Sequence, residues 1–288
     1  MLYAMLVIPV AYVIIFNYVP MYGIQIAFRD FSIRKGYWDS PFVGFTHFIS
    51  FFNGYYFWSL IRNTLTINIY GLTAGFICPI LLALMINEVG NKYFKKSVQM
   101  LTYLPRFISV VIVVSMISQL FSLQGIVNNV LSVFGLERIP FMSEENTFIH
   151  MYVWSDIWQM MGYNSIIYVA VLSNVNTELY EAARMDGANR LRIIWHINIP
   201  SIAPTITILL ILAMGGLMNL GFDKIYLMQN PLNINSSRVI STYVYEVGLL
   251  SMQYSFSTAV NLFNTVINFI LLFFANTLSR RVSETSLW

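Results

Sequence analysis

Charged residues are scarce in this chain of 288 residues: Asp, Glu, Lys and Arg together make up 10% of it, whereas 57% is hydrophobic. Soluble domains carry about 25% charged residues. The mean hydropathy of +0.65 points the same way. Most of the chain therefore cannot face water, and the composition predicts an integral membrane protein.

The residues and motifs of common enzyme sites are also missing. No glycine is followed directly by lysine, which excludes a phosphate-binding P-loop and the ATP hydrolysis that depends on it. His47, His150 and His196 are scattered, and the single cysteine, Cys78, has no partner, so the sequence offers no set of metal ligands and no internal disulfide. We therefore predict no catalytic residue, no metal and no cofactor in this chain.

Six apolar segments are long enough to cross the hydrocarbon core of a membrane, which takes about 20 residues. They cover residues 2–20, 60–85, 101–120, 150–172, 202–220 and 258–278. The first has neither the basic start nor the cleavage site of a signal peptide, so we interpret it as a span. Because it starts at residue 2, we expect a basic cytoplasmic tail to precede it. The sequence predicts an all-α, multi-pass protein with a single transmembrane domain over residues 1–288.

Lysine and arginine are unevenly distributed among the connecting segments. Eight follow the second, fourth and sixth spans within about 50 residues, whereas six lie in the other loops within about 100 residues. Basic residues favour the cytoplasmic side, so both termini and the loop at residues 174–200 are predicted to be cytoplasmic. The net charge of +3 is not gathered into a basic cluster, and we expect no nucleic-acid partner.

The loop at residues 174–200 is a polar segment between two apolar ones. It contains, in order, Glu181, Ala182, Ala183, Asp186, Gly187 and Pro200. Asn176 suits a helix N-cap and Gly187 a left-handed helix end, after which a second short helix is expected to stop at Pro200. The two alanines would let another protein approach the backbone closely, so the pattern predicts a docking element. An amphipathic hairpin lying on the lipid surface is the alternative.

The spacing in this loop, Glu-Ala-Ala, three residues, glycine, twelve residues and proline, resembles the EAA loop of ATP-binding-cassette (ABC) importer permeases, which sits in a cleft of the ATPase subunit. Further segments look like the Lpl-type permeases of carbohydrate importers, which are similar to the maltose-system permeases. These segments are Asn17 to Ile24, Asn230-Pro231, Ser241 to Tyr245, Asn276 to Arg281 and Ser286-Leu-Trp288.

The resemblance implies a function and a set of partners. It implies the six-helix, type I importer architecture in the bacterial inner membrane and the uptake of oligosaccharides, or of acidic polysaccharide fragments such as alginate, by alternating access. The implied partners are a second homologous permease, two ATPases that hold ATP and Mg, and an external solute-binding protein. Asn176, Asp223-Lys224 and Asn261 depart from the usual family pattern, so the resemblance does not fix the substrate.

Polar residues inside the predicted spans are candidates for a substrate pathway, because polar groups in hydrocarbon need partners. Span four mixes stacking surfaces with hydrogen-bonding groups. The candidates are Trp154, Asp156, Trp158, Gln159 and Asn164, together with Asn219 in span five and Asn261, Asn264 and Asn268, which share one face of the last span. Hydrogen bonding between helices is the alternative role for these asparagines.

A rival interpretation is a self-contained secondary transporter driven by protons through Asp156. Such transporters usually contain internal repeats and interrupted helices around a site at the middle of the membrane. The sequence shows no convincing repeat, and the polar loop at residues 174–200 would be left without a role. We therefore favour the ATP-driven importer.

Overall fold

The computed structural model describes residues 2–282 of the chain, and the side chains of residues 5–280. The closing motif Ser286-Leu-Trp288 lies outside the described residues. Within the described part the chain is helical and has no β-strand, only two isolated bridges, Arg29 to Phe42 and Ser32 to Gly36. The prediction of an all-α protein is confirmed.

Contacts divide the chain into two compact units, each of which is described by itself. Unit 1 comprises the residues up to 62 together with 239–267, and unit 2 comprises residues 63–238 together with those from 268 on. The helices α4 (Phe57–Glu88) and α15 (Tyr254–Val282) each contribute to both units.

Unit 1 begins with a continuous helical segment whose helix type changes along its length. The α-helix α1 (Leu2–Val13) is followed by a π-helix (Ile14–Tyr18) and a 3-10 helix (Val19–Phe28). The shorter elements are α2 (Gly36–Asp39), α3 (Thr46–Phe52), α14 (Ile240–Tyr245) and a second π-helix (Glu246–Leu250). Phe51 is buried against the rings of Phe57 and Phe263, at centroid distances of 5.1 and 5.5 Å. Aromatic packing therefore forms part of the core of this unit.

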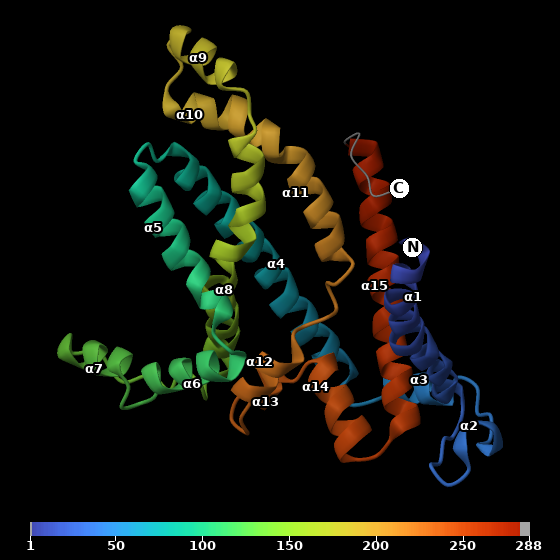
Figure 1. The fold of residues 1–288 in the computed structure, drawn as a ribbon. Coiled ribbons are helices and arrows are strands. Elements are labelled where there is room, and N and C mark those ends of the chain that lie inside the picture. Colours follow the sequence, from blue (N-terminus) through green and yellow to red (C-terminus); the bar gives the residue numbers. More distant parts are fainter. Residues whose placement is uncertain (1, 283–288) are drawn as a thin grey trace. The chain divides into compact units, whose positions relative to one another are not determined.

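Unit 2 is organised around the 29-residue helix α8 (Glu145–Ser173). Its other helices are α5 (Lys92–Tyr103), α6 (Val110–Leu120), α7 (Ile126–Val133), α9 (Thr177–Met185), α10 (Arg190–Ile193), α11 (Ile199–Met214), α12 (Phe222–Met228) and α13 (Ile234–Ser237). α8 contacts α5, α11 and α13. Figure 1 shows α9 and α10 at one end of α8, and α6, α12 and α13 towards its other end.

Four helical segments among the described residues are long and apolar enough to cross a membrane. They are Met5–Phe28, Phe57–Glu88, Arg190–Met214 and Tyr254–Arg280. The bent pair Lys92–Phe107 and Val110–Leu120 adds a fifth if it is counted as one span. α8 is long enough to cross a membrane but is not among these segments, because its polar side chains lower its mean hydropathy. The structure thus supports several spans, and the count of six stays a prediction.

The span predicted for residues 101–120 is not one continuous helix, because the helix is broken inside it. α5 ends at Tyr103, a short 3-10 turn covers Leu104–Phe107, and α6 runs off at 99°. Pro105 lacks a backbone N–H and its ring crowds the preceding turn, which ends the α-helix there. Gln159 of α8 donates a hydrogen bond of 3.0 Å to the carbonyl of Ile108, a backbone group outside both helices.

The expected helix stop at Pro200 is wrong. The chain stays helical from Arg190 to Met214, and Pro200 lies in the first turn of α11. A π-helical segment, Ile194–Asn198, precedes it. Proline has no N–H to donate to the helix, and the wider π-turn before it relieves the crowding of its ring against the preceding turn.

Gly162→Ala is expected to destabilise unit 2. A Cβ at residue 162 of α8 would collide with the backbone carbonyl of Thr102 in α5, which cannot rotate away as a side chain would. We expect the free energy of unfolding to fall by about 1–3 kcal/mol, measured as a lower thermal midpoint in detergent. The control is Gly75→Ala in α4, where nothing lies within 4 Å of the added Cβ. Equal midpoints for the two variants would contradict this close packing.

Candidate functional site

The loop at residues 174–200 folds into a helix, a left-handed turn and a second helix. The Oδ1 atom of Asn176 accepts a hydrogen bond of 3.0 Å from the N–H of Glu178 and caps α9. Gly187 has φ +74°, a conformation that favours glycine, and its N–H donates to the carbonyl of Arg184. Asn189 then caps α10 by accepting from the N–H of Arg192. The predicted N-cap and left-handed helix end are confirmed.

Most of the residues predicted to dock a partner lie on the surface of this element. Glu181, Ala182, Asp186, Gly187 and Pro200 are exposed, and Ala183 is half-buried. Met185, at the end of α9, is 88% exposed. The element therefore presents small and apolar side chains, beside acidic ones, to whatever lies next to it.

A chain of one buried and two half-buried polar groups connects α9 with two long helices. The hydroxyl of Tyr180 donates a hydrogen bond of 2.7 Å to Oδ1 of Asn198, and Nδ2 of Asn198 donates to Oε1 of Glu88 at 3.5 Å. Asn198 is fully buried, and Glu88 is the last residue of α4. Burial raises the pKa of Tyr180, so its hydroxyl keeps the proton that it donates. A displacement of α9 would therefore be transmitted through these hydrogen bonds to the ends of α4 and α11.

A cavity of about 690 Å³ opens among α4, α8, α12 and the bend between α5 and α6. It brings together three of the predicted pathway residues, Asp156, Gln159 and Asn219. Non-helical backbone between α11 and α12 also lines it, including Gly216 and Gly221. Polar side chains and non-helical backbone at one cavity are the arrangement that membrane transporters use to hold a polar substrate.

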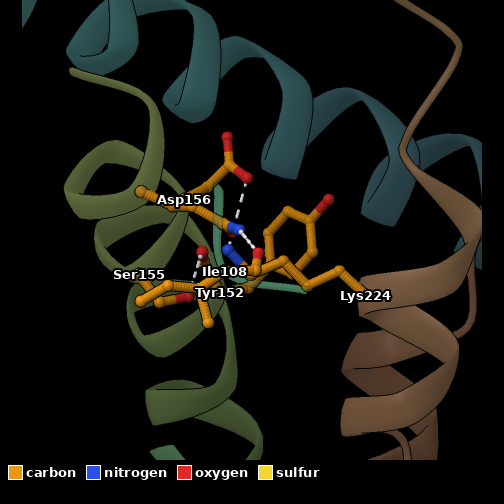
Figure 2. Close-up of polar contacts among 6 residues, drawn as sticks. Ile108, Tyr152, Ser155, Asp156 and Lys224 are labelled. Atoms are coloured by element: carbon orange, nitrogen blue, oxygen red, sulfur yellow. Dashed lines mark hydrogen bonds and ion pairs between the residues drawn. The ribbon is translucent and has the colours of Figure 1, made fainter. Parts of the chain in front are cut away.

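An ion pair lies on the wall of this cavity. Nζ of Lys224 in α12 is 3.2 Å from Oδ1 of Asp156 in α8, and it lies 5.5 Å from the ring centroid of Tyr152 (Figure 2). Lys224 is 5% exposed, whereas the side chain of Asp156 is 47% exposed. Burial lowers the pKa of Lys224, and the carboxylate of Asp156 opposes that shift. Both residues of the pair line the cavity, but the carboxylate is accessible there and the ammonium is buried.

The remaining predicted pathway residues are not part of this cavity. Asn164 lines a second cavity of about 630 Å³, and Trp154 and Trp158 are about half exposed and line neither of the two. Asn268 is buried, and its Oδ1 accepts a hydrogen bond of 2.8 Å from the N–H of Met218, which lies in the non-helical segment after α11. In unit 1, Asn264 is buried and Asn261 is exposed. Contact of any of these residues with a substrate stays a prediction.

Two cationic residues of the cavity were not predicted from the sequence. Lys224 was noted only as a departure from a family pattern, and its partner, Asp156, is 68 residues away in the chain. Arg106 lines the cavity at the bend between α5 and α6. Its charge inside an otherwise apolar segment was the feature that could have identified it. No group of three or more His, Cys, Asp or Glu residues within the described chain could hold a metal ion.

Comparisons with known proteins agree with this architecture. Residues 71–284 match the family described as binding-protein-dependent transport system inner membrane component. Protein LplB of Bacillus subtilis is 41% identical over 100% of this chain and 91% of its own length. The polygalacturonan/rhamnogalacturonan transport system permease protein YteP of the same organism is 42% identical over 100% of this chain and 90% of its own.

A solved structure is similar over nearly the whole chain. It belongs to a bacterial alginate ABC transporter in complex with an alginate pentasaccharide-bound periplasmic protein. The TM-score is 0.92 at 42% identity, and the match covers 99% of this chain and 96% of the other. The chain therefore belongs to the family of binding-protein-dependent transport system inner membrane components, the permease subunits of ABC importers, which transport and do not catalyse.

Proposed function

We propose that this chain carries oligosaccharides, including acidic polysaccharide fragments, across the cytoplasmic membrane by alternating access. Relatives that match along its whole length support this, because they are named for polygalacturonan, rhamnogalacturonan and alginate transport. Several other relatives are named for neutral or short sugars, such as arabinooligosaccharides and lactose. The proposed substrate class is therefore sugar, and relatives named for acidic sugars are among those that match along nearly the whole chain.

The energy is proposed to enter through the segment formed by α9, Gly187 and α10. The observation that carries this proposal is its exposed surface around Ala182 and Met185, held in shape by the left-handed Gly187. A cleft of an ATPase subunit fits over this surface, and Glu181, Ala183, Asp186 and Pro200 complete the coupling element. ATP and Mg are bound by the ATPase. The buried link from Tyr180 through Asn198 to Glu88 transmits the movement of α9 to α4 and α11.

The assembly is proposed to contain this chain, a second homologous permease, two ATPases and an external solute-binding protein. Both termini and the coupling element face the cytoplasm, in keeping with the distribution of basic residues. The cavity with Asp156, Gln159 and Asn219 then lies on the way through the protein. Carboxylates and amides are suited to the hydroxyl groups of a sugar because they accept and donate several hydrogen bonds.

A proton-coupled transporter is not supported. Asp156 would have to take up and release protons, yet its carboxylate is held in an ion pair with the buried Lys224 at 3.2 Å. Membership of the binding-protein-dependent family gives the loop at residues 174–200 a role that this alternative leaves unexplained.

A photo-reactive amino acid at Met185 is expected to crosslink this chain to the ATPase. Met185 is 88% exposed at the end of the proposed docking helix. The measurement is the mass and identity of the crosslinked product in membranes that contain the whole importer. The control is Phe134, which is 77% exposed just after α7 and should give no ATPase product. Lipid adducts alone at Met185 would favour the amphipathic hairpin and contradict docking.

A further inference from the structure

Arg106 occupies an unusual place in the fold. It lies in the 3-10 turn Leu104–Phe107, where the segment predicted as a span is broken by 99°. Non-helical backbone at membrane depth is tolerated where it is buried in protein or lines a cavity. An ionisable side chain within a membrane segment is costly, so its presence points to a function.

The guanidinium of Arg106 is positioned but not neutralised. Its Cζ atom lies 5.5 Å from the ring centroid of Tyr163 in α8, which holds the side chain by a cation–π contact. Arg106 is exposed and lines the 690 Å³ cavity. Among the described residues, no carboxylate lies within 4.0 Å of the Arg106 guanidinium. The exposed Asp223 lines the same cavity without pairing with it.

The two cations of the cavity therefore differ in what they can bind. Lys224 is buried and its charge is already paired with Asp156, whereas Arg106 is exposed, lines the cavity and has no carboxylate partner. A guanidinium presents its N–H groups as a planar fork that matches the two oxygens of a carboxylate. Attraction between the two charges is stronger in a cavity than in open water, because the surrounding dielectric is lower.

We propose that Arg106 binds the carboxylate of an acidic sugar residue as it passes through the cavity, and so sets the preference of this permease for charged over neutral oligosaccharides. Asp156, Gln159 and Asn219 would contact the hydroxyl groups of the same sugar chain. This inference rests on the proposed function. A purely structural role, in which Arg106 only fixes the bend by stacking on Tyr163, is the competing explanation.

The test compares two sugars in the whole importer reconstituted in liposomes. One is a labelled oligouronide, and the other is its carboxyl-reduced counterpart with the same length and linkages but no charge. Both are supplied with saturating binding protein, whose loading with each sugar is measured separately. The variants are Arg106→Gln and Arg106→Lys. The control is Arg62→Gln, which changes an exposed arginine of α4 that does not line the cavity.

We expect Arg106→Gln to lower uptake of the oligouronide by about tenfold and uptake of the neutral sugar by less than about twofold. Arg106→Lys keeps a point charge without the planar fork and should give an intermediate, still selective loss. Arg62→Gln should leave both rates unchanged. If Arg106→Gln does not assemble with its partners, the ratio of the two uptake rates in Arg106→Lys distinguishes carboxylate binding from a purely structural role.

Four results would overturn the inference. An equal fractional loss for both sugars in Arg106→Gln would show a structural role, and unchanged uptake of both sugars would show that Arg106 does not bind the carboxylate. A wild-type importer that takes up only the neutral sugar would overturn the inference while leaving the transport function intact. A wild-type importer that takes up neither sugar with ATP would overturn the proposed function, and this inference with it.

Discussion

Gly187→Pro is expected to uncouple ATP hydrolysis from uptake and to lower sugar uptake by about tenfold or more, because proline fixes φ near −65°. Gly187 has φ +74°, and its N–H donates to the carbonyl of Arg184, so proline can supply neither the turn nor the hydrogen bond. α9 would then lose its orientation relative to α10. Uptake and ATP hydrolysis by the reconstituted importer measure the effect. Insertion into the membrane should be normal, since Gly187 is exposed and nothing lies within 4 Å of an added Cβ.

Gly135→Pro is the matched control for this variant. Gly135 has φ +76°, follows the helix α7 and donates its N–H to the carbonyl of Ser132, so proline disturbs the same local geometry at a different place. It should leave the ATPase bound and coupled. Normal uptake in the Gly187→Pro importer would contradict the proposal that α9, Gly187 and α10 form the coupling element.

Asp156→Asn is expected to destabilise the protein more than Lys224→Gln does. Removing the carboxylate leaves the buried ammonium of Lys224, which is 5% exposed, without a counter-charge, at a cost of about 3 kcal/mol. Removing the ammonium leaves Asp156, whose side chain is 47% exposed, within reach of water, at a cost of about 1 kcal/mol or less. Thermal midpoints of the two variants in detergent measure this asymmetry.

The double variant Asp156→Asn with Lys224→Gln is the control, because it removes both charges and should recover most of the stability lost in Asp156→Asn. Its uptake should still require ATP and should not respond to a proton gradient. A greater loss of stability in Lys224→Gln than in Asp156→Asn would contradict the burial of the lysine. Uptake driven by a proton gradient would support the rival interpretation, in which Asp156 carries protons.

The conformation of the loop at residues 174–200, the proposed coupling element, was predictable because it follows from local rules. An N-cap asparagine, a run of helix formers and a glycine at the left-handed end act over a few residues, and Asn176 and Gly187 behave as those rules require. The same rules failed at Pro200. There the π-helical segment Ile194–Asn198 carries the helix through the proline, and the sequence gives no local sign of that wider turn.

The break at Pro105 shows a limit of structure prediction from hydropathy. The apolar composition of residues 101–120 identified a segment apolar enough for a membrane, but it could not indicate that the helix bends there. Hydropathy measures transfer into lipid and contains no information on backbone geometry. The proline that causes the bend was present in the sequence. What completes the bend is Gln159, which is 51 residues from the carbonyl of Ile108 that it satisfies.

Composition was enough to establish the class of protein and its all-α character, short-range patterns the conformation of the loop at residues 174–200, and resemblance to known permeases the family. Which polar residues meet became visible in the three-dimensional structure alone. It paired Asp156 with Lys224, gathered Gln159 and Asn219 at the same cavity, and placed Arg106 there without a carboxylate partner. Such contacts join helices that are distant in the chain, so they depend on how the helices pack, which periodicity along one helix does not specify.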